Sequence, residues 1–165
     1  MGLKALSSIE RERILRRNWW GHDGRWFFQV ASELGFSKAN RMNMAINRAV
    51  GKMEMKNFLS ASGLSGIGIQ QSMLDILKAN LEMCAADVFS IRYFRQAGDT
   101  FTLVIDECAA HTGTVRAGYA EDYECACFKR SEGWLDAMGI RGSARIVASL
   151  LKGDSHCKIS IKLEK

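Results

Sequence analysis

The chain has 165 residues, of which 47% are hydrophobic and 25% are charged. This composition is ordinary for a globular protein, and it excludes disordered, collagen-like and coiled-coil classes. No apolar run approaches the roughly 18 residues that span a bilayer, and the first residues lack the apolar core of a signal peptide, so we expect no membrane span and a cytoplasmic location. The length predicts a single domain over residues 1–165, with a helical half at 1–86 and a cysteine-rich α+β half at 87–165.

Charge is distributed unevenly along the chain. Up to Cys84 there are 12 Lys and Arg against 7 Asp and Glu, and beyond it 11 against 11, so the first half carries the whole net charge of +5. Near the N-terminus, Arg11 and Arg13 alternate with Glu10 and Glu12, which is typical of a solvated helix face. A nucleic-acid binder instead gathers its cations on one surface. We therefore do not expect nucleic acid as a partner.

The N-terminal segment predicts two successive helices. Ser7 followed by Glu10 forms a capping box, which opens an amphipathic helix running to about Trp20. Asp23 is placed to cap a second helix, which Gly35 would end because glycine tolerates a left-handed conformation. The apolar side of the first helix consists of Ile9, Ile14, Leu15 and Trp19.

Two further helices are predicted before the pattern changes. A third begins at Ser37, and apolar residues at helical spacing should press one side of it on the core. That stripe consists of Met42, Ile46, Val50 and Met53. After a break at 60–68, apolar residues from Ile69 to Cys84 mark a fourth helix, with Cys84 on its apolar side.

The second half shows the alternating pattern of strands. Residues 88–95 and 101–106 flank the turn Gly98-Asp99 and predict an antiparallel hairpin, and residues 144–151 and 156–163 predict a second one around Gly153-Asp154. One amphipathic helix around Trp134 is inserted between the hairpins. The predicted fold class is therefore α+β, with N-terminal helices packed on a four-stranded antiparallel sheet built from two hairpins.

Soft metal ligands are concentrated in the second half. It contains four of the five cysteines and two of the three histidines, namely Cys108, His111, Cys125, Cys127, His156 and Cys157. Thiolates and imidazoles bind zinc, and thiolates hold iron–sulfur clusters. We expect a zinc ion or an iron–sulfur cluster held by Cys108, Cys125, Cys127 and Cys157, with His111 or His156 as a substitute. The single residue between Cys125 and Cys127 departs from the usual Cys-x-x-Cys spacing.

Two other interpretations fit the same cysteines. Free cysteine is often a core residue, which accounts for Cys84 and equally well for Cys157. Cys125 and Cys127 lie on one side of an extended segment after a run of acidic residues, where core cysteines would be unusual. Alternatively, one cysteine is a nucleophile that His111 or His156 activates, which requires an exposed thiol of low pKa within reach of the base.

Residues 19–28 contain five aromatic side chains around Asp23. Aromatic residues most often pack in a core, and Asp23 would then serve as a helix cap. The alternative is a pocket with aromatic walls and one charged group, which suits an apolar or planar small molecule. The candidate ligand-binding residues are Trp20, His22, Asp23 and Trp26.

Several of these segments resemble known families. Residues 20–28, with Glu33-Leu-Gly-Phe and Lys38-Ala-Asn, resemble a family of cytosolic proteins from anaerobic prokaryotes. The second half, with Cys108, Cys125-Ala-Cys127 and Cys157-Lys-Ile-Ser-Ile, is similar to the L-2-amino-thiazoline-4-carboxylic acid hydrolase-like family and, more loosely, to vinyl-4-reductase ligand-binding domains. These resemblances imply an α+β domain whose cysteines lie near a pocket for a metal or a small ligand.

Together these observations predict a cytoplasmic small-molecule-binding or sensory domain with a cysteine-rich metal site. The alternative, which the resemblance implies, is a cysteine-dependent hydrolase of a cyclic thiazoline or a related C–N bond. The sequence leaves open whether the protein is an enzyme. The expected partner is a small-molecule ligand, and a second copy of the chain, in a homodimer, is a further candidate.

Overall fold

The computed structural model describes residues 5–64 and 72–164. In chain order the elements are α1 (Ser8–Leu34), α2 (Phe36–Ser62), α4 (Met73–Ala85), β1 (Phe89–Ala97), β2 (Thr100–Cys108), α5 (Ala109–Arg116), α6 (Cys127–Met138), β3 (Gly142–Ala148), the 3₁₀ turn η1 (Leu150–Lys152) and β4 (Cys157–Leu163). Helices precede a sheet that two hairpins supply, so the predicted α+β class is confirmed. Helix α5 was not predicted, because its eight residues show little apolar periodicity.

The four strands form one antiparallel sheet in the order β1-β2-β4-β3. Both predicted hairpins are present, and the two inner strands, β2 and β4, join them. Buried residues face one another across that junction, with Phe101 opposite Ile161 and Leu103 opposite Ile159. Such cross-strand pairs set the register, because a slip by one residue would turn the whole apolar set toward solvent.

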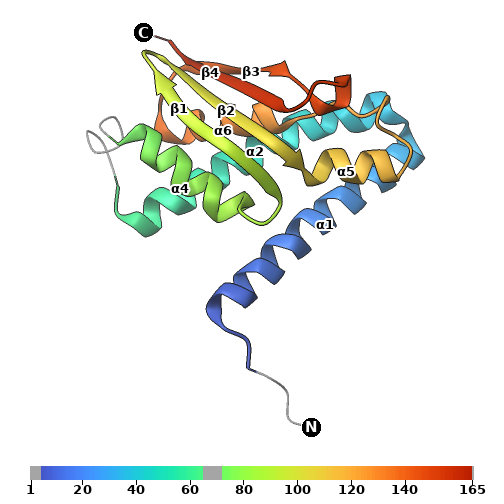
Figure 1. Ribbon diagram of the computed structural model, residues 1–165, viewed down its shortest axis with the longest axis horizontal. Helices are drawn as coiled ribbons and strands as arrows, with labels where there is room; N and C mark the ends of the chain where they lie inside the picture. Colours follow the sequence, from blue (N-terminus) through green and yellow to red (C-terminus); the bar gives the residue numbers. More distant parts are fainter. Residues whose placement is uncertain (1–4, 65–71, 165) are drawn as a thin grey trace.

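Helices cover one face of the sheet (Figure 1). Helix α6 packs against β3 and β4, α4 packs against β1, and α2 packs against α6 and α4. The hydrophobic core between these layers includes Leu77 of α4, Trp134 and Leu135 of α6, and the inner strand residues. The inserted helix around Trp134 is therefore confirmed as a core element.

The N-terminal segment forms one continuous helix, α1, and not the two predicted helices. The capping box of Ser7 and Glu10 begins it, and Gly35, with φ of 81°, ends it as expected. Asp23 lies within the helix and caps nothing. Gly21 and Gly24 both lie inside α1, where each glycine costs roughly 0.5–1 kcal/mol, and the helix nevertheless continues through them.

Most of the apolar stripe predicted for the start of α1 lies outside the core. Ile9, Ile14, Leu15 and Trp19 are between 45% and 67% exposed. The N-terminal part of α1 projects away from the rest of the molecule, so it has few neighbours to pack against (Figure 1). The amphipathic pattern identified an apolar face, but periodicity does not identify a partner for that face.

Helix α2 turns a different face to the core than its apolar stripe predicts. Met42, Ile46 and Met53 are 42–49% exposed, whereas Gly51 is buried. A Cβ atom on Gly51 would collide with the Arg130 carbonyl of α6, and one on Gly133 of α6 would collide with the Arg48 carbonyl of α2. The two helices therefore cross backbone to backbone at paired glycines, and this contact decides the buried face of α2.

The predicted fourth helix corresponds to α4, which begins at Met73. Ile69 and residues 65–68 of the predicted break lie outside the described residues. Helix α2 continues through residues 60–62 and ends at Ser62, where Gly63 adopts the left-handed conformation with φ of 67°, so the helix ends slightly later than predicted. Cys84 is half-buried, and burial raises the pKa of its thiol to about 12.

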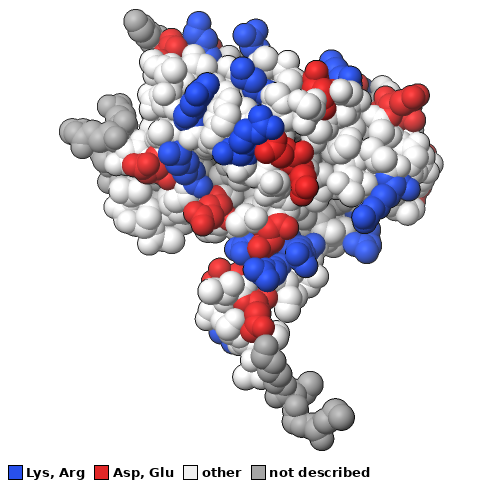
Figure 2. All heavy atoms as spheres, in the orientation of Figure 1, with Lys and Arg blue, Asp and Glu red and all other residues white. Residues whose placement is uncertain are grey.

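Charged side chains of both signs intermingle on the face shown in Figure 2. The cations of α1 are accompanied by carboxylates, and Arg13 and Arg16 pair with Asp87. On this face the surface lacks the uniform basic patch that nucleic-acid binding requires. Among the described helices, none is both long enough and apolar enough to cross a membrane.

Candidate functional site

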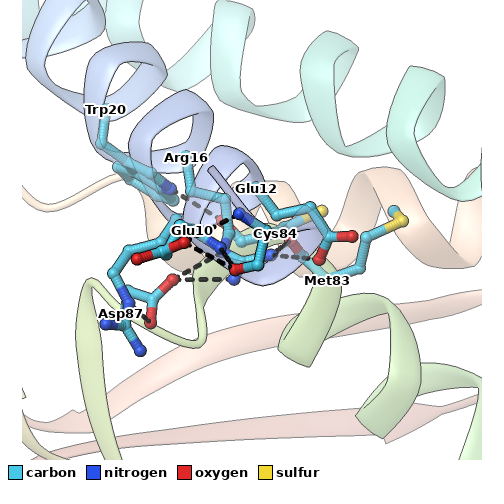
Figure 3. Close-up of polar contacts among 9 residues, drawn as sticks. Glu10, Glu12, Arg16, Trp20, Met83, Cys84 and Asp87 are labelled. Atoms are coloured by element: carbon cyan, nitrogen blue, oxygen red, sulfur yellow. Dashed lines mark hydrogen bonds and ion pairs between the residues drawn. The ribbon is translucent and has the colours of Figure 1, made fainter. Parts of the chain in front are cut away.

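A set of polar contacts fastens the middle of α1 to the end of α4 and the residues that lead into β1 (Figure 3). The Arg16 guanidinium donates from Nε and Nη2 to Asp87 Oδ2 at 2.9 and 2.7 Å. The Trp20 indole N–H donates to the Cys84 carbonyl at 2.8 Å. We call Arg16, Trp20 and Asp87 the α1 latch. The latch holds the middle of α1 against the end of α4 and the residues that precede β1.

A cavity of about 490 Å³ lies next to the latch. Its walls come from α1, from the start of β1 and the end of β2, from α5, and from residues 123–127 that lead into α6. The aromatic residues of the wall are Trp20, Phe27, Phe28, Phe89 and Tyr123. The volume is within the range of small-molecule sites, which are typically about 300–1,000 Å³ and mostly apolar.

The aromatic wall is held by edge-to-face contacts between distant segments. Trp20 meets Phe89 with ring centroids 5.0 Å apart and planes at 88°, and Phe27 meets Tyr123 at 5.0 Å and 89°. This arrangement places the positive edge of one ring on the negative face of the other. The Arg130 guanidinium lies 4.5 Å from the Trp20 ring centroid, so this indole is fixed from a second side.

Asparagines of α2 position the segment that closes the cavity. Asn40 is buried, its amide nitrogen donates to the Asp122 carbonyl at 2.7 Å, and its oxygen accepts from the Glu124 N–H at 3.0 Å. One side chain thereby satisfies the backbone on both sides of Tyr123, much as a neighbouring strand would. Residues 123–126 are fixed in place although they belong to no helix or sheet.

Two further asparagines on the same face of α2 form a chain of hydrogen bonds that reaches the cavity. The Asn47 amide nitrogen donates to Asn43 Oδ1 at 2.7 Å, and the Asn43 side chain hydrogen-bonds to the Tyr123 hydroxyl. All three residues line the cavity. Burial raises the pKa of Tyr123, while the Asn43 side chain acts in the opposite direction, so the phenol keeps its proton at neutral pH.

Asp23 supplies a carboxyl group to an otherwise aromatic part of the wall. Burial raises its pKa, while the charges of Arg130 and His22 act in the opposite direction. Arg130 is itself paired with Glu54, and both side chains are nearly buried. Arg130 therefore serves both Glu54 and Asp23, and its charge does not fully offset the burial of Asp23. The pKa of Asp23 stays above that of an ordinary aspartate.

The candidate ligand-binding residues divide between two sides of α1. Trp20 and Asp23 line the cavity, whereas His22 and Trp26 do not. Trp26 is 60% exposed, and its indole N–H donates to His22 Nε2 at 3.1 Å on the outer side of the helix. The continuous helix explains this division, because positions 22 and 26 share one face of α1 while 20 and 23 turn inward.

Three of the predicted cysteine ligands reach the cavity wall: Cys108, Cys125 and Cys127. The Cys125 and Cys127 sulfurs are 3.0 Å apart and hydrogen-bonded to each other. Burial raises the pKa of Cys108 to about 12, against the lowering effect of the Ala110 and His111 backbone amides. Cys157 is buried on β4 outside the lining, and its sulfur accepts the Leu150 N–H at 3.4 Å.

The predicted metal ligands are divided between the cavity wall and positions outside it. Among residues 5–64 and 72–164, no group of three or more His, Cys, Asp or Glu side chains is placed to hold an ion. Two thiolates on a tetrahedral zinc with Zn–S bonds of about 2.3 Å would lie about 3.8 Å apart, whereas the Cys125–Cys127 separation is 3.0 Å. Neither His111 nor His156 lines the cavity.

Sequence analysis missed several residues of the wall. Asn43 and Asn47 share a helix face with Asn40, and polar residues at spacings of three and four on a helix that also carries an apolar stripe are the signal that identifies them. Tyr123 and Phe89 carry no comparable signal. They reach the cavity through tertiary contacts with α1.

Comparison with solved structures identifies proteins of similar fold. The chain is similar to a trafficking protein particle complex subunit 3 from Naegleria fowleri covalently bound to palmitic acid, with 15% identity over 94% of this chain and 96% of that chain and a TM-score of 0.63. It is also similar to the phenol-responsive sensory domain of the transcription activator PoxR with phenol, with 12% identity over 98% of this chain and 76% of that chain and a TM-score of 0.60.

No protein-family model matches the chain, and no curated protein matches it. The families named from sequence resemblance therefore stay predictions. At these identities the two structures establish a shared fold and nothing about the ligand of this chain.

Proposed function

We propose that this protein is a small-molecule-binding domain of the sensory type, and that its ligand occupies the cavity between α1 and the sheet. The observation that carries the proposal is the cavity of about 490 Å³ with its aromatic wall. A space of this size and lining, without a ligand, leaves apolar surface unpacked that a bound molecule would cover. The fold shared with a phenol-responsive domain and a palmitate-bound subunit supports the same function.

The wall favours a largely apolar ligand that carries a hydrogen-bond acceptor. Aromatic side chains provide the contact area, and the Tyr123 hydroxyl, which burial keeps protonated, provides a directional donor. Asp23 adds an acceptor when ionised and a second donor when protonated. A hydroxyl or carbonyl group on a planar or aliphatic molecule would satisfy these groups.

The proposal is tested by titrating the protein separately with phenol and with palmitic acid. We expect one of these probes to bind saturably with one molecule per chain, to raise the thermal midpoint, and to change the fluorescence of Trp20. A ligand present at 100 times its Kd stabilises the folded state by about 2.7 kcal/mol. A Tyr123→Phe variant should bind the same probe more weakly, because it lacks the hydroxyl donor. Absence of saturable binding by both probes would contradict the proposal.

The metal site and the hydrolase activity stay predictions from sequence. Elemental analysis of anaerobically purified protein tests the first, since stoichiometric zinc or iron would mean that the sulfurs rearrange around an ion. Turnover of a thiazoline carboxylic acid tests the second. A nucleophilic cysteine would need a base, and both histidines of the second half lie off the cavity wall.

A further inference from the structure

Cys125 and Cys127 form a pair of adjacent thiols in the cavity wall. Their sulfurs are 3.0 Å apart, and both side chains are only partly exposed. A disulfide bond is about 2.05 Å long, so closing the pair requires the sulfurs to approach by roughly 1 Å. Since both residues line the cavity, a small reagent that enters it can reach the pair.

The backbone between the two residues is already bent in the sense that a disulfide needs. In an extended chain the Cα atoms of residues two apart are separated by roughly 7 Å, beyond the usual span of a disulfide. Ala126 has φ of −104° and ψ of 4°, and Cys127 begins α6, so the chain turns at this point. The expectation of an extended segment was therefore wrong here, and the turn brings the two cysteines together.

The upstream side of the pair is held independently of the cysteines. Asn40 binds the backbone at Asp122 and Glu124, and the Phe27 ring packs edge to face on Tyr123. Cys125 follows directly after this fixed segment. The two sulfurs are thus held close by the fold, which favours a bond between them over a bond to a third cysteine.

The two thiols differ in chemical character. The Cys127 thiol and the Cys127 backbone N–H hydrogen-bond to the Cys125 sulfur at the start of α6, and these bonds lower the pKa of Cys125 although burial opposes them. The same contact and burial raise the pKa of Cys127. Burial raises the pKa of Cys84, Cys108 and Cys157 as well. The backbone N–H at the start of α6 bonds to the Cys125 sulfur, so this geometry assigns Cys125 as the nucleophile of the pair and Cys127 as the thiol that resolves it.

We propose that Cys125 and Cys127 are an oxidisable dithiol, which hydrogen peroxide or another small peroxide converts to a disulfide in the cavity wall. The Cys125 thiolate attacks one peroxide oxygen, the O–O bond breaks, and the departing hydroxide takes up a proton to become water. The Cys125 sulfenic acid is then attacked by the Cys127 sulfur, the S–S bond forms, and the S–O bond breaks as a second water leaves. Two thiols and one peroxide thus become one disulfide and two waters.

This inference does not rest on the proposed ligand, because it uses only the two thiols and their surroundings. The experiment treats the full reduced chain with a slight excess of hydrogen peroxide, blocks the remaining thiols with N-ethylmaleimide, and maps the peptides by mass spectrometry. We expect alkylation to fall from all five cysteines to three, with a peptide that has lost two hydrogens and contains residues 125–127. Alkylation of all five, or a disulfide that joins other cysteines, would overturn the proposal.

Single substitutions at Cys125 and Cys127 distinguish the nucleophile from the resolving thiol. Cys127→Ser should leave Cys125 as a sulfenic acid that dimedone traps, whereas Cys125→Ser should give no dimedone adduct at Cys127. Cys84→Ser is the matched control, because Cys84 lies away from the pair, and it should still form the disulfide. Equal dimedone labelling of both single variants would contradict the assignment of Cys125 as nucleophile. Zinc bound to either sulfur in the purified protein would contradict the proposal itself.

Discussion

Three glycines border the cavity where other residues would place side chains. Gly21 and Gly24 lie on α1 and Gly113 lies on α5. A Cβ atom added at Gly24 or Gly113 would meet no atom within 4 Å, so these positions face open space. Their helical conformation does not require glycine. The open volume therefore depends on the absence of side chains at these positions.

This absence yields a prediction for Gly24. Replacing it by Ala should stabilise the fold by about 0.5–1 kcal/mol, because glycine is unfavourable inside a helix. Gly24→Leu should keep that gain but fill part of the cavity, and should weaken binding of the phenol or palmitate probe by about tenfold or more, which corresponds to ~1.4 kcal/mol. Thermal unfolding and calorimetric titration measure the two effects. Unchanged affinity in Gly24→Leu would place the ligand elsewhere.

A second residue-scale prediction concerns Asn80 of α4. Its side chain is fully buried, and within the described residues neither polar atom of its amide has a hydrogen-bond partner. An unsatisfied buried polar group costs about 1–3 kcal/mol, so Asn80→Leu should raise the free energy of unfolding by an amount of that order. The control is Asn40→Leu, which removes two hydrogen bonds and should destabilise. Chemical denaturation measures both, and destabilisation by Asn80→Leu would contradict the argument.

At the scale of elements, α1 forms one wall of the cavity. It is joined to α2 through Gly35 at one end, and in its middle the α1 latch ties it to the residues before β1. The paired glycines hold α2 and α6 to each other more rigidly, since their backbone contacts leave no space for adjustment. We therefore expect α1 to respond first when a ligand enters.

The contact between Arg16 and Asp87 in the α1 latch should weaken at low pH. The Arg16 guanidinium, assisted by Arg13, holds the pKa of Asp87 below its ordinary value. A carboxylate with a lowered folded-state pKa contributes its full stabilisation above the unfolded pKa, near 3.9, and loses it as the pH falls through the folded-state value. Hydrogen exchange in α1 should accelerate below about pH 4. In Asp87→Asn, exchange in α1 should be faster at neutral pH and should lack this pH-dependent step.

At the scale of the whole molecule, both halves of the sequence contribute to one hydrophobic cluster, in which Met55 and Leu77 pack with residues of the sheet. The described residues of both halves thus share one core, while the single domain over residues 1–165 stays a prediction. The homodimer stays a prediction, and light scattering would distinguish the mass of one chain from that of two. The exposed apolar side chains of α1 and α2 are the surface that such an association would bury.

The sequence by itself determined the two strand pairs and the tight turn of the first, because alternation and Gly-Asp turns are local signals, whereas the end of the predicted strand at 144–151 forms the 3₁₀ turn η1. Gly98 and Gly153 lie where predicted, and Cys157, Ile159 and Ile161 face the core as their alternation requires. The capping box at Ser7 and the helix around Trp134 are local in the same sense. For the candidate site, local sequence patterns singled out Trp20, Asp23, Cys125 and Cys127. All four line the cavity.

Only the tertiary structure decided which faces the long helices bury and which side chains meet. The apolar stripe of α2 was a poor guide, because the contact between Gly51 and α6 sets the orientation of the helix. Tyr123 joins the wall through Asn40, 82 residues before the carbonyl that this asparagine binds. A cavity is volume that no side chain fills, and that depends on distances between elements remote in sequence, which no local pattern encodes.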